Sequence, residues 1–152
     1  MTLENLLAIH KLQTFEPNAA GVQRLLLAAE RNLADAGISA LSSENRFDAA
    51  YKSIMQCAMI GLWANGYRTS TNQPGHHQTA LQVLPKTLGV EQDAVIVLDA
   101  LRKQRNLSDY EGDPISDGAV AECHRQAALL LEQTRLWLRQ HRPDLLVGRE
   151  SS

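Results

Sequence analysis

Charged side chains continue the buried face of a predicted helix in the second half of the chain. Val95 and Leu98 lie at the spacing of one helical face, and the same spacing leads on to Arg102, Arg105 and Asp109. Charge at positions where packed apolar side chains are expected is costly unless it is paired or serves a ligand. The helix segment that carries Arg102, Arg105 and Asp109 is therefore the candidate functional site. The alternative is an Arg105–Asp109 pair on a solvated helix end.

Two histidines and another arginine are further candidates for the same chemistry. His76 and His77 open a predicted helix, and adjacent helical residues point about 100° apart, so at most one should face a cleft shared with Arg105. A structural role at the helix start is the favoured reading for this pair. Arg68, beside the polar loop 69–72, is a second candidate for phosphate contact, although solvated loop residues are the commoner case.

Composition limits the class of protein. The chain has 152 residues, a size typical of one domain, with 44% hydrophobic and 21% charged residues. A formal charge of −2 argues against a generally basic nucleic-acid binder, and 5% aromatic residues argue against an RNA surface built on stacked rings. We see neither a secretion signal nor an apolar window of about 20 residues, so we expect a cytoplasmic protein with no membrane contact.

The sequence lacks the motifs that a metal site or a thiol redox centre would need. Cys57 and Cys123 belong to no CxxC pair, and no HxxxH or HxxE pattern accompanies His76 and His77. We predict no metal site and no cofactor, and we expect both cysteines to be small core residues.

The apolar periodicity is helical almost throughout, and no convincing strand pattern is present. We expect a short helix from Leu3 through Lys11, a polar loop over 67–75 and a frayed tail over 143–152. Five further helices are expected, around 22–33 with Gly37 as its stop, around 47–63 up to Asn65, from His76 to Pro85 or Gly89, over 91–108 and over 116–141. This pattern predicts an all-α, up-and-down bundle of about five to six helices in a single domain, residues 1–142.

Three stretches of the chain carry a resemblance to a known family. The first is Arg46-Phe47-Asp48-Ala49-Ala50-Tyr51, leading into the helix that ends in Ala64-Asn65-Gly66-Tyr67-Arg68. The second is Gly75-His76-His77-Gln78, and the third is Arg105-Asn106 followed by Tyr110. In order and spacing these stretches resemble the HEPN superfamily of small helical bundles, over roughly residues 1–142.

The resemblance implies a candidate site with one departure from the family's pattern. Active HEPN ribonucleases carry an arginine, often followed by a polar residue, and then a histidine after four to six positions. Arg105 and Asn106 match the first part, and Tyr110 stands where the histidine would be. Histidine is a suitable base for removing the 2′-hydroxyl proton, whereas tyrosine has an ordinary pKa near 10. The candidate catalytic residues are Arg105 and Tyr110.

The resemblance also implies a ligand and partners. The candidate phosphate-binding residues are Arg102, Arg105, Asn106, Arg68 and His77, because arginine donors match phosphate oxygens. HEPN proteins pair with their motif helices facing one cleft, so a homodimer is expected, together with an RNA or nucleotide ligand. A nucleotidyltransferase-type partner would fit a toxin–antitoxin system.

Three functions remain open at this point. The first is a HEPN-like nucleic-acid or nucleotide-binding protein of a defence or toxin–antitoxin system, with ribonuclease activity weak or lost. The second is a non-enzymatic helical interaction module, a homodimer scaffold in which Arg102, Arg105 and Asp109 form only an ion-pair network. The third is an active metal-independent HEPN ribonuclease that uses Tyr110 or a histidine from elsewhere.

Overall fold

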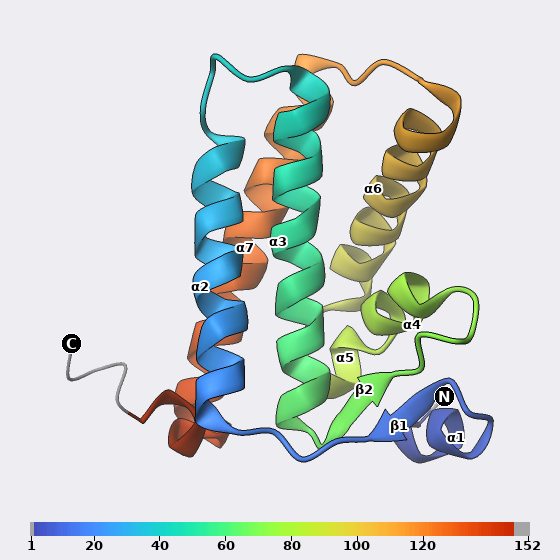
Figure 1. Ribbon diagram of the computed structural model, residues 1–152, viewed down its shortest axis with the longest axis vertical. Coiled ribbons are helices and arrows are strands. Elements are labelled where there is room, and N and C mark those ends of the chain that lie inside the picture. The colour runs from blue at the N-terminus through green and yellow to red at the C-terminus, as the bar shows by residue number, and fades with distance from the viewer. Residues whose placement is uncertain (1, 148–152) are drawn as a thin grey trace.

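Helix α3, Ser43–Ala64, is the element around which the other long helices pack. In the computed structural model, which describes residues 2–147, α3 contacts α2 (Ala19–Ala36), α6 (Gln92–Glu111) and α7 (Asp117–His141). Figure 1 shows α2 and α3 side by side, α7 behind them and α6 on the other side of α3. The chain direction alternates through α2, α3, α6 and α7. The predicted all-α helical bundle is confirmed.

Capping side chains set where the long helices begin. Asn18 accepts a hydrogen bond from the backbone N–H of Gly21 at the start of α2, and Ser42 and Ser116 do the same for α3 and α7. These bonds satisfy backbone donors that have no partner inside the helix. Gly112 ends α6 in the left-handed conformation, with φ of 73°. Helix α6 therefore continues three residues beyond the predicted end at Ser108, and Tyr110 lies on it.

Two short helices lie between α3 and α6. Helix α4 spans His76–Gln82 and α5 spans Leu84–Thr87, so the single helix expected here is divided at Val83. Asn65 donates hydrogen bonds to the carbonyls of Gly61 and Thr87, which ties α5 to the end of α3. Helix α4 packs against both α3 and α6. This packing brings His76 and His77 to the middle of α6.

A small sheet corrects the expectation that the chain has no strand. Strands β1 (Leu12–Thr14) and β2 (Tyr67–Thr69) pair antiparallel, with Leu12 opposite Thr69. Helix α1, Leu3–Ala8, stops before Lys11, because His10 has a φ of 65° that a helix does not allow. The strands were missed because three residues are too few to display an alternating pattern.

The residues after α7 are ordered against the bundle. Pro143–Leu146 form a 3₁₀ turn in which Leu145 and Leu146 are buried, and Gln23 of α2 donates to the carbonyls of Leu145 and Val147. The frayed tail predicted from Pro143 is therefore wrong for residues 143–147, because two leucines complete the core beside α2. Residues 148–152 lie outside the described part of the chain.

The core is one cluster of apolar side chains contributed by helices throughout the chain. Leu26, Ile54 and Leu131, from α2, α3 and α7, are almost fully excluded from solvent. Cys57 and Cys123 are also buried, as the sequence predicted. Between residues 2 and 147, no helix has the length and apolar character that crossing a bilayer requires.

Candidate functional site

A pocket of about 300 Å³ lies where α4 meets the second half of α6. It is lined by Gly75, His76, His77, Gln78, Arg102, Arg105, Asn106 and Tyr110. All of the predicted site residues except Arg68 are therefore gathered in one place. The pocket combines cationic, imidazole, amide and phenol groups, which is the set expected for a polar ligand rather than an apolar one.

Arg105 lies at the centre of the site and contacts three different segments. Its Nε lies 2.8 Å from Asp109 Oδ2 and 3.7 Å from Asp48 Oδ1. Its guanidinium carbon lies 5.5 Å from the centroid of the Tyr51 ring, within the range of a cation–π contact. The Arg105–Asp109 pair, which the sequence offered as the alternative reading, is present together with a concave pocket beside it.

The donors of Arg105 are poorly satisfied by hydrogen bonds. The Nε–H is buried yet not aligned with the carboxylate, so among the described residues it has no hydrogen-bond partner. Nη1 donates to Asn106 Oδ1 across a long 3.4 Å. A guanidinium carries five hydrogen-bond donors, and a buried donor that forms no hydrogen bond destabilises the fold. Arg105 is thus held in place by charge while most of its donors remain for a ligand.

Arg102 is held by a carboxylate in a similar way. Its Nε donates to Asp99 Oδ1 at 2.8 Å, and Lys103 Nζ lies 3.5 Å from the other oxygen of Asp99. Burial acts to raise the pKa of Asp99, but the hydrogen bond from Arg102 and the charges of Arg102 and Lys103 together lower it, so this carboxylate is ionised at neutral pH. Within residues 2–147, no side chain accepts a hydrogen bond from the Nη nitrogens of Arg102.

Tyr51 and His77 form a polar pair next to Arg105. The Tyr51 hydroxyl lies 3.2 Å from His77 Nδ1, and the Tyr51 side chain is only 2% exposed. Burial raises the pKa of Tyr51 to about 12, although the Arg105 and Arg102 charges act in the opposite direction. Burial also lowers the pKa of His77, and the charges of His76, Arg105 and Arg102 lower it further. At neutral pH the pair therefore consists of a phenol and a neutral imidazole.

His76 and Tyr110 complete the wall and rim of the pocket. The His76 and His77 rings meet edge to face with centroids 4.7 Å apart, and both line the pocket. The expectation that at most one of them faces the cleft is therefore wrong, because the pocket surrounds the start of α4 rather than one side of it. Tyr110 is 78% exposed at the rim and also borders an open groove along α6.

Arg68 lies elsewhere. It is on β2, where its Nε donates to Gln13 Oε1 at 3.1 Å and its guanidinium lies 5.5 Å from the centroid of the Phe15 ring. Figure 1 shows β2 at one end of the bundle, beside β1. Arg68 is not among the residues that line the pocket around Arg102 and Arg105, which we call the arginine pocket. The structure therefore does not bring Arg68 together with Arg105.

Two residues of the site were not identified from the sequence. The sequence marked neither Tyr51 nor Asp48 as a site residue; both were noted only within the first of the three stretches. A usable signal was present, because a buried tyrosine hydroxyl usually finds a polar partner. Tyr51 in the middle of a core stripe therefore indicated a polar contact, although nothing local to α3 identified His77 as that contact.

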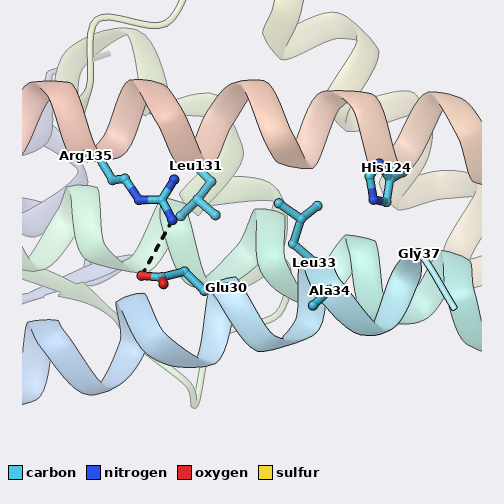
Figure 2. A pocket seen from close by; sticks show the side chains of 7 residues that line it. All are labelled: Glu30, Leu33, Ala34, Gly37, His124, Leu131 and Arg135. Carbon is cyan, nitrogen blue, oxygen red and sulfur yellow. Dashed lines mark ion pairs between the residues drawn. The ribbon is translucent and has the colours of Figure 1, made fainter.

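A second cavity, between α2 and α7, has a different character. Figure 2 shows Glu30 and Arg135 paired across it at one end, with His124 and Gly37 at the other. The Glu30–Arg135 distance is 3.6 Å, and the remaining lining is Leu33, Ala34 and Leu131. Its polar groups do not converge on one point, so we regard this cavity of about 380 Å³ as a packing groove.

Metal binding and thiol chemistry have little support in the described residues. Between residues 2 and 147, no group of three or more His, Cys, Asp or Glu side chains is placed to hold a metal ion. Burial raises the pKa of both thiols, Cys57 and Cys123, to about 12. Neither thiol is therefore a nucleophile at neutral pH.

Comparison with known proteins adds no family assignment. No protein-family model matches the sequence, and no curated protein matches it. A helical bundle supports many unrelated functions. The function of this chain is therefore inferred from the pocket around Arg105 and from the residues that meet there.

Replacing Arg105 with Gln should raise the pKa of His77, because the substitution removes a positive charge that opposes protonation of the ring. Burial, the larger cause, remains, so the pKa should stay below 6.5. The measurement is an NMR titration of the His77 ring protons. Arg125→Gln is the matched control, since Arg125 also pairs with a carboxylate of its own helix, Glu122, but lies outside the pocket. An unchanged or lower His77 pKa in Arg105→Gln contradicts the described contact.

Proposed function

We propose that the pocket binds a phosphate group of a nucleotide or of single-stranded RNA, and that the protein is a HEPN-like binding protein. One observation carries this proposal: the three stretches behind the HEPN resemblance meet around Arg105. Asp48 and Tyr51 of the first stretch contact its guanidinium, His77 of the second lies against Tyr51, and the third contains Arg105 itself. A concave pocket with a few convergent polar groups is the default candidate for a ligand site.

The arginines are arranged for hydrogen bonding to an oxyanion. Each has its Nε beside a carboxylate, which restrains the side chain and leaves the Nη nitrogens for another acceptor, apart from the long bond from Arg105 Nη1 to Asn106. A guanidinium fork matches two phosphate oxygens at once, and charge-assisted bonds of this kind are about twice as strong as neutral ones. The Asn106 side chain, which also lines the pocket, offers an amide donor beside them.

The charge balance favours a short ligand over a long nucleic-acid backbone. Arg102, Lys103, Arg105 and Lys52, which pairs with Asp48, are set against Asp99, Asp109 and Asp48, so this group of side chains has a net formal charge of only +1. Binding then depends on directed hydrogen bonds to one phosphate, and not on the long-range attraction of a basic surface for many phosphates. The exposed ring of Tyr110 at the rim offers a surface on which a base can stack.

The proposed working unit is a homodimer formed through α6. The exposed residues Ile96, Ala100, Lys103, Leu107 and Tyr110 follow one another at alternating spacings of four and three residues. That spacing is the seam of a two-stranded coiled coil, which buries such positions against a second helix. Pairing two copies of α6 would place a second Arg102 and Arg105 near the first.

The biological setting in this proposal is a defence or toxin–antitoxin system with a nucleotidyltransferase-type partner. This part follows from the HEPN resemblance alone. Ribonuclease activity is proposed to be weak or lost, because Tyr110 stands in the position of the family's histidine and is a poor base at neutral pH.

An active metal-independent ribonuclease is the second candidate, and one observation favours it. His77 reaches the arginine pocket with a lowered pKa, and it could replace the missing histidine as the base. RNA cleaved to 2′,3′-cyclic phosphate ends in the presence of a chelator would establish this function. A pure scaffold is less favoured, because the carboxylates leave most of the Arg105 donors without hydrogen bonds.

Replacing both Arg102 and Arg105 with Gln should weaken binding of AMP and of a short single-stranded RNA by about a hundredfold, since each substitution removes a charge-assisted bond to phosphate. The readout is fluorescence polarisation with a labelled ligand. For one phosphate, Kd should rise only about threefold between 50 and 200 mM salt, whereas six phosphate contacts would give a few hundredfold.

The matched control for this experiment is again Arg125→Gln, which removes a carboxylate-paired arginine from the exposed surface of α7. It should leave the affinity unchanged. Equal affinities for the wild-type protein and the Arg102/Arg105 double variant would refute the phosphate-binding proposal.

Replacing Ile96 or Leu107 with Asp should convert the proposed dimer into a monomer, because it exchanges an apolar side chain of the seam for a charged one. Light scattering coupled to gel filtration measures the mass. Leu129→Asp is the control: Leu129 is a similarly exposed leucine on α7 and lies outside the seam. A wild-type protein that is already monomeric at high concentration would overturn the dimer.

A further inference from the structure

We propose that Tyr51 is a positioning residue that holds His77 as a hydrogen-bond donor to the bound phosphate, with the imidazole proton on Nε2. The inference rests on the phosphate-binding function proposed above and assigns the role of its histidine. It also gives the histidine a single function, donation to an oxyanion, in place of proton removal from a ribose hydroxyl.

The direction of the Tyr51–His77 hydrogen bond follows from the surroundings of the tyrosine. Within residues 2–147, the hydroxyl of Tyr51 has His77 Nδ1 as its hydrogen-bond partner and no other. If Nδ1 carried the proton and donated it, the buried hydroxyl proton would have no acceptor, which is a costly arrangement. Tyr51 therefore donates, Nδ1 accepts, and the neutral ring carries its proton on Nε2.

The charges around the pair support the same direction. Arg105 lies against the Tyr51 ring, and both Arg105 and Arg102 are near enough to influence the titration of Tyr51 and His77. Nearby positive charge favours the orientation in which the phenol oxygen turns its lone pairs towards the guanidinium groups and its proton towards Nδ1. His76 is the other titratable neighbour of the ring, and it too disfavours a second proton on His77.

The consequence concerns what the pocket can do chemically. With Nδ1 occupied by Tyr51, Nε2–H is the polar group that His77 still has for a ligand in the pocket it lines. A neutral N–H donor beside two guanidinium groups recognises a phosphoryl oxygen. It offers no free lone pair to accept the proton of a 2′-hydroxyl. His77 is thus a binding residue for an oxyanion, and its presence in the pocket does not restore the base that Tyr110 fails to supply.

The direct test is the tautomer of His77, read from the ¹⁵N chemical shifts of its ring nitrogens above the pH at which it titrates. Nε2 should have the shift of a protonated nitrogen and Nδ1 that of an unprotonated one. In Tyr51→Phe, which removes only the hydroxyl, the two shifts should move towards a mixture of tautomers. A proton on Nδ1 in the wild-type protein overturns the proposal, whether or not any ligand binds.

A second experiment measures the binding of AMP by His77 variants. The amide of Gln can place an N–H near the position of Nε2, so His77→Gln should retain more affinity than His77→Ala, which should lose about tenfold. If Arg105→Gln weakens binding and His77→Ala does not, phosphate binding stands and the role of His77 fails. If neither substitution weakens binding, the proposed function fails, and the ¹⁵N shifts still report the tautomer. Cyclic-phosphate RNA products that disappear in His77→Gln would identify His77 as a base and overturn the inference.

Discussion

The contact of Arg105 with α3 is the interaction on which the rest of the site depends. Tyr51 lies under the guanidinium and Asp48 lies beside its Nε, so a residue of α6 is fixed by two residues of the central helix. Because α3 is buried against most of the bundle, this contact places Arg105 relative to the whole fold rather than relative to a loop. Helix α4 then brings His77 to the hydroxyl of the same tyrosine.

Charge compensation explains how so polar a cluster is tolerated at the edge of a core. Unpaired guanidinium groups in a partly buried position would be destabilising, and Asp99, Asp109 and Asp48 offset them. The compensation acts at Nε and is geometrically incomplete for Arg105, whose buried Nε–H lacks a hydrogen bond. The site is therefore close to electrically neutral while it remains rich in donors, and these properties suit recognition of a single phosphate.

The sequence predicted those parts of the site that a local pattern encodes. Arg102 and Arg105 were identified because they interrupt an apolar stripe, and the helical bundle followed from the same periodicity. The pairing of Tyr51 with His77 joins residues on different helices, and it depends on how α4 packs against α3 and α6. No local periodicity carries that information. The short strands and the buried Leu145 and Leu146 escaped prediction for a related reason, since each is stabilised by a partner distant in the chain.

The most direct test of the central claim is to map where AMP binds, using backbone amide chemical shifts during an NMR titration. If the three stretches form one phosphate-binding site, the shifts that change should cluster at His76–Gln78, around Tyr51 and over Arg102–Tyr110. The groove between α2 and α7, with Glu30 and His124, should be unaffected. Shift changes confined to that groove, or none at saturating AMP, would contradict the account.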